Sequence, residues 1–280
     1  MRVVNVDIIT ETIKDMCIKA NHFLSKDMEE VFYSAYEEEE SPLGKQVLEQ
    51  LKDNLEIAGN DMIPICQDTG MAVIFIEVGQ EVHIVGGSLE EAINEGVRQG
   101  YTEGYLRKSV VNDPIERVNT KDNTPAIIHY SIVTGDKIKI TTAPKGFGSE
   151  NMSRIFMLKP SDGIEGVKNA VITTVKDAGP NACPPMVVGV GIGGTFEKCA
   201  ILSKKALTRS AVSHSSIPYV KELEEELLEK INKLGIGPGG LGGTKTALSV
   251  NIETYPTHIA GLPVAINICC HVNRHVTMNI

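Results

Sequence analysis

The first 58 or so residues of the chain carry apolar side chains at the spacing of an α-helix. The pattern predicts one helix through about residue 20, a second over 28–36 and a third over 44–58, with a Ser-Pro break before the third. Cys17 lies on the apolar stripe of the first helix, which predicts a buried structural role for it. The stripe consists of Ile8, Ile9, Ile13, Met16, Cys17 and Ala20.

The pattern changes after residue 66. A continuous apolar run over 71–78 predicts a buried strand. Ser88 then opens a helix as its N-cap, with Glu91 at the capping-box position. Two alternating segments, 127–133 and 137–142, are separated by a short Thr-Gly-Asp sequence. We expect these two segments to form a hairpin.

The remainder of the chain alternates between helical and extended patterns, without repeats or low-complexity tracts. The sequence therefore predicts a single domain over residues 1–280 of the α+β (mixed α/β) class. Its helical N-terminal part precedes a mixed sheet region flanked by helices. The further elements expected are helices over 164–178, 196–207 and 219–234 and strands over 186–190, 247–253 and 262–269.

Composition excludes several classes of function. The hydrophobic share of 42% and the charged share of 22% are ordinary for a soluble globular protein of 280 residues. A net charge of −9 and an aromatic share of 5% argue against nucleic acid or an anionic membrane surface as a partner. No apolar run approaches the roughly 18 residues of a membrane span. No secretory signal is visible, and the six cysteines lack the spacing of a disulfide scaffold. We therefore expect a reducing cytoplasm.

Two glycine-rich segments resemble nucleotide-binding motifs. The segment 189–194 matches G-x-G-x-x-G, but no acidic residue follows about 20 positions later, which disfavours a dinucleotide site. The segment 235–246 resembles a P-loop superficially, yet Thr244 stands where glycine should precede the lysine. Its backbone amides could approach a small anion closely, because no Cβ intervenes at the glycines. An ordinary tight loop remains an equal alternative.

Three cysteines occupy unusual local settings that indicate chemistry. Cys66 begins a polar Cys-Gln-Asp-Thr-Gly segment, Cys183 precedes two prolines, and Cys270 ends an apolar strand and is followed by His271. The close Cys-x₂-Cys pairs typical of zinc sites are absent. Single thiolates on three separate loops are compatible with an iron–sulfur cluster, which has no fixed ligand spacing. Spacing by itself leaves ordinary structural roles open.

Three polar segments near these cysteines would suit a small dianion. Arg107 begins one of them, Lys145–Asn151 combines a lysine with small residues and an amide, and His258 lies twelve residues before Cys270. Arginine matches carboxylates bidentately, and glycine amides add further donors. Any one of these residues alone would more often be structural or solvated.

Seven phrases are spread along the chain: ICQDTG, DNTPA, KGFGSEN, NACPP, GVGIGGTFEKCA, GPGGLGGTKTAL and THIAGLPVAINICCH. Together they resemble the N-terminal or α part of class I fumarases, the iron–sulfur hydro-lyase family in which L-tartrate dehydratase is a close relative. The resemblance implies that Cys66, Cys183 and Cys270 bind a [4Fe–4S] cluster whose fourth iron is open to substrate. Asn267 fixes the family N-x-x-C register, which selects Cys270 over Cys269.

The same resemblance implies which residues contact the substrate. They are Gln67, Asp68, Arg107, Gly148 and His258. The expected reaction is the interconversion of fumarate and (S)-malate, a step of the tricarboxylic acid cycle. No catalytic residue is expected in this chain, because single-chain members carry the general base in a C-terminal domain.

This sequence ends at Ile280, so we expect an α subunit, inactive alone, in an α2β2 enzyme whose β subunit supplies the base. The alternatives are the α subunit of an L-tartrate dehydratase and, from other classes, a non-catalytic iron–sulfur protein or a nucleotide-binding protein.

Overall fold

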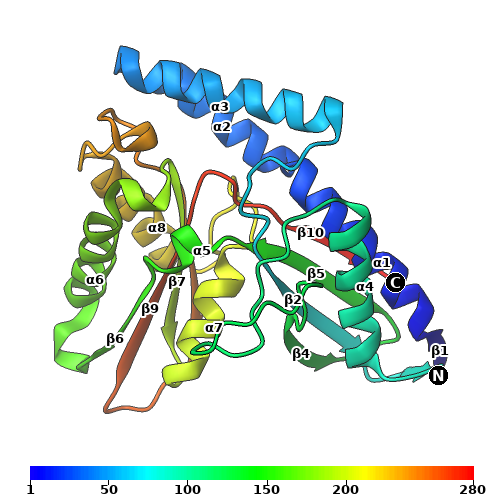
Figure 1. Cartoon of the computed structure of the whole chain (residues 1–280). Helices are drawn as coiled ribbons and strands as arrows, with labels where there is room; N and C mark the ends of the chain where they lie inside the picture. The colour runs from blue at the N-terminus through cyan, green and yellow to red at the C-terminus, as the bar shows by residue number, and fades with distance from the viewer. The chain divides into compact units, whose positions relative to one another are not determined.

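Two strand-centred units, each assembled from segments distant in the sequence, make up the chain (Figure 1). The structure is a computed structural model and describes all 280 residues. It has the mixed helix-and-sheet composition of the α+β class, as expected. The expectation of one domain over 1–280 stays a prediction. The first unit comprises residues 1–25, 55–147 and 274–280, and the second comprises 26–54 and 148–273.

The first unit packs two helices against one face of a four-stranded sheet. Apolar residues at helical spacing on α1 (Val6–His22) and α4 (Leu89–Glu103) meet Ile74 and Ile76 of the central strand. Side chains cap both helices, since Asn5 accepts from the Asp7 amide at 2.9 Å and Ser88 from Glu91 at 3.4 Å. The sheet order is β10-β5-β2-β4, from β10 (Val276–Asn279), β5 (Ile138–Lys145), β2 (Met71–Gly79) and β4 (Ile127–Val133).

The predicted hairpin between the segments 127–133 and 137–142 is wrong, although both strands exist. β2 lies between β4 and β5, pairing parallel with β4 and antiparallel with β5. β2 is buried along most of its length and needs a neighbour on each side, whereas a local turn signal reports only that the chain changes direction. The turn between β4 and β5 therefore passes the end of β2.

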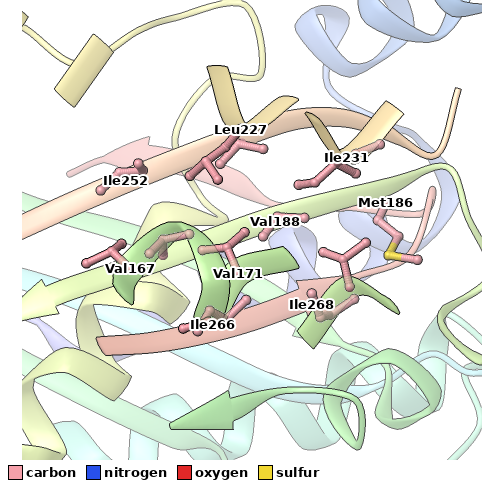
Figure 2. Close-up of a cluster of buried hydrophobic side chains, with 14 of the residues drawn as sticks. Val167, Val171, Met186, Val188, Leu227, Ile231, Ile252, Ile266 and Ile268 are labelled. Atoms are coloured by element: carbon pink, nitrogen blue, oxygen red, sulfur yellow. The ribbon is translucent and has the colours of Figure 1, made fainter. Parts of the chain in front are cut away.

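The second unit places helices on both faces of its own four-stranded sheet, in the order β6-β9-β7-β8. Figure 2 shows Val167 and Val171 of one helix and Leu227 and Ile231 of another lying over the strands. These helices are α6 (Gly163–Ala178) and α8 (Pro218–Asn232). The strands are β6 (Arg154–Leu158), β7 (Met186–Gly193), β8 (Ala247–Tyr255) and β9 (Leu262–Cys269).

The glycine motif at 189–194 serves helix packing on the other face of β7. A Cβ atom at Gly189 would lie 2.2 Å from the carbonyl oxygen of Ser203, and one at Gly191 would lie 2.1 Å from that of Cys199. Both carbonyls belong to α7 (Phe196–Ala206), so only glycine allows the helix to approach so closely. Residues of β7 that alternate with these glycines, such as Val188 and Val190, enter the core beneath α6 and α8.

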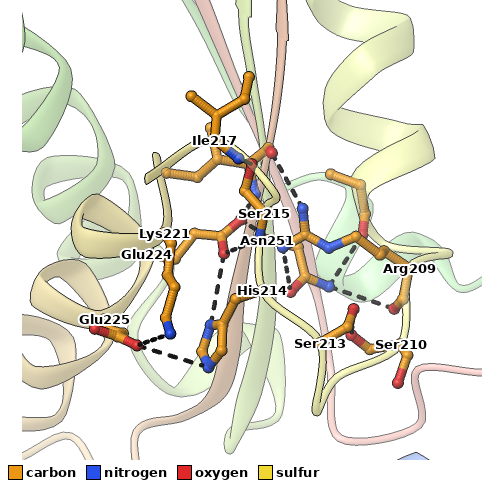
Figure 3. Close-up of polar contacts among 12 residues, drawn as sticks. Arg209, Ser210, Ser213, His214, Ser215, Ile217, Lys221, Glu224, Glu225 and Asn251 are labelled. Atoms are coloured by element: carbon orange, nitrogen blue, oxygen red, sulfur yellow. Dashed lines mark hydrogen bonds and ion pairs between the residues drawn. The ribbon is translucent and has the colours of Figure 1, made fainter. Parts of the chain in front are cut away.

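A buried carboxylate, Glu224 on α8, holds the segment that follows α7 (Figure 3). It accepts hydrogen bonds from Arg209, from the Ser215 amide at 3.0 Å and from the Ile252 amide at 2.8 Å. Arg209 also reaches the side chain of Asn251 at 3.2 Å. The network therefore fixes a polar loop to α8 and β8 at once.

The remaining elements are short strands and helices around these two sheets. The two short strands, β1 and β3, pair with each other in a separate parallel sheet, and their four-residue apolar patterns were too brief to identify. No helix combines the length and the apolar character needed to cross a membrane. These elements are β1 (Arg2–Asn5), β3 (Val82–Val85), α2 (Lys26–Glu38), α3 (Pro42–Asp61), α5 (Phe147–Glu150) and the 3₁₀ turns η1 (Pro160–Asp162), η2 (Gly179–Ala182) and η3 (Pro238–Gly240).

Candidate active site

The loop that carries Cys66 enters β2 in the first unit and is held by buried polar groups. The hydroxyl of Tyr101 donates to the carbonyl oxygens of Thr69 and Gly70, at 2.7 and 3.1 Å. The Asn123 side chain donates to the Gly70 carbonyl at 3.1 Å. Gly70 has a φ of +74°, and a Cβ atom there would lie 2.7 Å from the backbone of Lys145. The motif therefore requires glycine where the loop crosses the end of β5.

Three of the predicted substrate contacts gather around this loop. The carboxylate of Asp68 accepts from the Gly70 amide at 3.1 Å and from the Phe147 amide at 2.8 Å. The Thr69 hydroxyl donates to the carbonyl of Arg107 at 2.8 Å. Gln67 and Arg107 are exposed, and the exposed Gly148 follows Phe147 in the chain. Asp68 is thus engaged with backbone amides, a role that shapes the turn before Gly148.

Cys183 and Cys270 lie at one end of the sheet in the second unit. Strands β7 and β9 are antiparallel, with Val187 opposite Cys269, so the residues before β7 adjoin those after β9. Cys183 ends η2 in a left-handed conformation with φ of 52°. Its carbonyl accepts from the backbone amide of His271 at 3.3 Å and from the ring Nδ1 at 3.0 Å. The fold therefore brings two of the three predicted ligands together.

His258 lies at the opposite end of the same sheet. It belongs to the loop between β8 and β9, and Tyr255 pairs with Gly193 at the far end of β7. The eight residues of β7 span roughly 25 Å at the usual rise of a strand. His258 is exposed, and its Nδ1 accepts from the Ala260 amide at 3.2 Å. Within one chain, His258 does not join Cys183 and Cys270.

Burial separates the six cysteines into two groups. Cys17, Cys199 and Cys269 are buried, whereas Cys66, Cys183 and Cys270, the predicted ligands, are partly or fully exposed. Burial raises the pKa of Cys17 to about 12 and also raises that of Cys199. Metals bind the thiolate, so these two thiols are poor ligands. The Asp68 amide, in contrast, donates to the sulfur of Cys66 at 3.4 Å.

The three predicted ligands are the right donor type for an iron–sulfur cluster. Cys66 lies in the first unit, and Cys183 and Cys270 lie in the second. No group of three or more His, Cys, Asp or Glu side chains is arranged as a metal site in this structure. Cys183 and Cys270 are therefore the two predicted ligands that one end of a single sheet brings together.

Arg274 is a site residue that the sequence reasoning missed. It is buried, donates from Nε to the Pro144 carbonyl at 3.3 Å, and donates from Nη2 to the backbone carbonyl of Asp68. Its Nη1 is buried and has no hydrogen-bond partner. An arginine two residues before the short strand β10 was the available signal. Its partners, however, lie some 130 and 206 residues away in sequence.

Comparison with known proteins places the chain among the hydro-lyases. The family model described as "Fumarate hydratase (Fumerase)" matches residues 10–279, so the chain belongs to the fumarate hydratase family.

Two relatives are similar over nearly the whole chain. One is the "Putative L(+)-tartrate dehydratase subunit alpha" of Methanocaldococcus jannaschii, 42% identical over 98% of this chain and 96% of the relative. Another is the L(+)-tartrate dehydratase subunit alpha of Escherichia coli, 32% identical over 98% of this chain and 91% of the relative.

Proposed function

We propose that this chain is the α subunit of an iron–sulfur hydro-lyase that interconverts fumarate and (S)-malate. In this proposal Cys66, Cys183 and Cys270 bind a [4Fe–4S] cluster. One observation carries it most directly. Cys183 and Cys270 lie beside each other at one end of a sheet, and both belong to the group of three cysteines that are not buried. Membership of the fumarate hydratase family supports the reaction class.

The chain's own residues would bind and orient the dicarboxylate. When bound, the cluster supplies a Lewis-acidic iron for the substrate hydroxyl and carboxylate. Arg107 is exposed beside the Cys66 loop and can pair with a carboxylate through its guanidinium fork. Asp68 orders the backbone before Gly148, where the absence of a side chain lets a substrate approach the amide. Gln67 is an exposed amide on the same loop.

Tartrate is the second candidate substrate, and the names of the relatives favour it. Fumarate hydration and tartrate dehydration both add or remove water next to a carboxylate, so the same cysteines and Arg107 would serve either. Steady-state rates with fumarate, (S)-malate and L-tartrate, measured on one anaerobic preparation, separate them. The fumarate assignment is wrong if kcat/KM for L-tartrate exceeds that for fumarate and malate by tenfold or more.

A partner chain is part of the proposal. Both relatives are named as alpha subunits, which supports a β subunit that supplies the general base. His258 lies at the sheet end opposite Cys183, so it would contact a dicarboxylate only in the site of another copy of this chain. That requirement agrees with an α2β2 assembly. Exposed cluster thiolates also favour a reducing cytoplasm.

The experiment that tests the function is electron paramagnetic resonance of the anaerobically reconstituted protein, with and without malate. After reduction with dithionite to its paramagnetic state, a cluster with an open iron should give a spectrum that changes when malate binds. A cluster with an unchanged spectrum indicates a non-catalytic iron–sulfur protein, and no cluster at all refutes the proposal. If the α chain alone hydrates fumarate as fast as the αβ mixture, the β subunit does not supply the base.

A further inference from the structure

The carboxylate of Glu39, one residue beyond the end of α2, is the most heavily hydrogen-bonded buried acid in the second unit. The side chain is only 1% exposed. Its Oε1 accepts from the Ser41 and Thr244 amides, each at 2.8 Å, and from the Thr244 hydroxyl at 3.2 Å. Its Oε2 accepts from the amides of Thr244 and Lys245, at 3.0 and 2.8 Å. Such a set of backbone donors is an anion-binding nest.

The glycines around Glu39 are shaped to this carboxylate. A Cβ atom at Gly243 would lie 2.7 Å from Oε1, and one at Gly44 would lie 2.9 Å from Cδ. The resemblance of 235–246 to a phosphate-binding loop therefore has a structural explanation. The loop does bind an anion through its backbone amides, and that anion is the protein's own glutamate.

The hydrogen bonds also keep this carboxylate charged. Burial alone would raise the pKa of Glu39, but the bonds from Ser41, Thr244 and Lys245 outweigh that effect and lower the pKa below its usual value. An ionised Glu39 therefore fills the nest at neutral pH.

The opposite side of the same loop contacts the segment that carries Cys183. The Gly239 amide donates to the Pro184 carbonyl at 2.9 Å. A Cβ atom at Gly240 would lie 2.3 Å from Cβ of Pro180, so the two backbones are in close contact. The Met186 amide donates to the Thr246 carbonyl at 2.8 Å. Contacts at residues 180, 184 and 186 thus bracket Cys183 on both sides.

We propose that Glu39 is a positioning residue for Cys183, acting through the glycine-rich loop. Glu39 holds the backbone of Thr244 and Lys245, which lie at the end of the glycine-rich loop. The loop, held in this way, supports the backbone on either side of Cys183. This inference rests on the proposed role of Cys183 as a cluster ligand. Glu39 itself touches neither the substrate nor the cysteines.

The test compares Glu39→Gln with Glu38→Gln in the anaerobically reconstituted full chain. Glutamine keeps the size of Glu39 but places an NH₂ group against amides that donate. Hydrogen bonds to charged groups are the stronger ones. We therefore expect amide hydrogen exchange over 236–246 to accelerate by at least about tenfold in E39Q. Glu38 is exposed and accepts only from the side chains of Ser34 and Lys245, not from the loop's backbone amides, so E38Q should exchange like the wild type.

The second readout is the cluster itself. Loss of iron to a chelator, measured as the decrease in the visible absorption of the cluster, should be at least about fivefold faster in E39Q than in E38Q. The inference is overturned if E39Q loosens the loop while iron loss and the resonance spectrum match the wild type. It is also overturned if E38Q and E39Q lose iron equally fast.

A milder variant covers the case in which E39Q does not fold. Thr244→Val removes one hydroxyl donor and leaves the backbone nest intact, so it should shift both readouts in the same direction by a smaller factor. A normal rate of iron loss in T244V combined with faster exchange over 236–246 would also refute the role of the loop. A wild-type protein that binds no cluster refutes the proposed function instead, so the two failures are distinguishable.

Discussion

The carbonyl oxygen of Cys183 accepts hydrogen bonds from both the backbone amide and the ring Nδ1 of His271, at 3.3 and 3.0 Å. Because a carbonyl only accepts, the imidazole must carry its proton on Nδ1 in this contact. His271 follows Cys270 directly. The contact therefore fixes the backbone of one predicted ligand against that of the other.

Replacing His271 by alanine should loosen that pair. Losing one neutral hydrogen bond costs about 1 kcal/mol of unfolding free energy, which urea denaturation measures. Because the remaining backbone bond holds the cysteines less rigidly, the reconstituted variant should also lose iron faster. His83→Ala, at an exposed position of β3, is the control and should change neither quantity. Unaltered iron retention in H271A would show that the ring does not fix the cysteine pair.

Asn123 is the buried hub of the polar segment before β4. Its Oδ1 accepts from the amides of Ser109 and Val110, at 2.7 and 3.2 Å, and its Nδ2 donates to the Gly70 carbonyl at 3.1 Å. Asn123→Ala would leave these buried groups without partners, so we expect a loss of about 3 kcal/mol of unfolding free energy. The exposed Asn119→Ala should cost under about 1 kcal/mol. Equal losses in both variants would contradict this role for Asn123.

Local periodicity was sufficient to predict most elements, because the residues that decide a helix or a buried strand lie close in sequence. The apolar stripe of Ile9, Ile13 and Met16 predicted α1, and Ser88 predicted the start of α4, as observed. Strand partners cannot be predicted in this way, because the pairing of a buried strand depends on which strands cover both of its edges. The burial of β2 decided the order β5-β2-β4, and the turn after Val133 carried no information about it.

The residues of the candidate site divide in the same way, into those that their sequence neighbours identify and those that only the folded chain brings together. The phrases around Cys66 and Cys183 marked their loops because unusual residues are adjacent there. Arg274 and Glu39 escaped notice, since their partners are 206 and 205 residues away and only the folded chain joins them. The position of His258 at the far sheet end likewise follows from strand direction, which the order of motifs along the sequence does not contain.

Gly148 offers a substitution that separates binding from folding. A Cβ atom at Gly148 would meet nothing within 4 Å, so Gly148→Ala should change unfolding free energy by less than about 0.5 kcal/mol. If a substrate carboxylate approaches this backbone, the added methyl group should raise KM at least about tenfold in the αβ enzyme. Gly163→Ala, also in open space but at the start of α6, tests strain alone because its φ is +53°. An unchanged KM in G148A would remove Gly148 from the substrate site.

Asp122 gives a pH dependence with a definite sign. Burial acts to raise its pKa, but hydrogen bonds from the Thr124 amide and hydroxyl and from Arg98 dominate and lower the pKa to about 2, from an ordinary 3.8. Because the pKa of Asp122 is lower in the folded than in the unfolded protein, the charged carboxylate stabilises the fold at pH values above the unfolded pKa. This stabilisation is lost as pH falls from about 4 to 2. With the side chain 27% exposed, the contribution is about 2 kcal/mol.

The variant Asp122→Asn should therefore be about 2 kcal/mol less stable than the wild type at pH 7, and this difference should shrink as pH falls below 4. Urea denaturation of both proteins between pH 7 and pH 3 measures it. Asp136→Asn, at an exposed turn, should track the wild type throughout. A difference that stays constant with pH would mean that the Asp122 carboxylate is not the titrating group.

Glu224 tests how the second unit holds its polar loop. The side chain is 1% exposed and accepts from Arg209, Ser215 and Ile252 (Figure 3). Glu224→Ala leaves the half-buried Arg209 and two buried amides without their carboxylate, so we expect a loss of about 3 kcal/mol in urea denaturation. Glu225→Ala, whose side chain is 51% exposed, should cost under about 0.5 kcal/mol. Because the loop, α8 and β8 all meet at Glu224, amide exchange over 209–217 should rise in E224A only. Similar stability in the two variants would show that Asn251 and the backbone carbonyls satisfy Arg209 without Glu224.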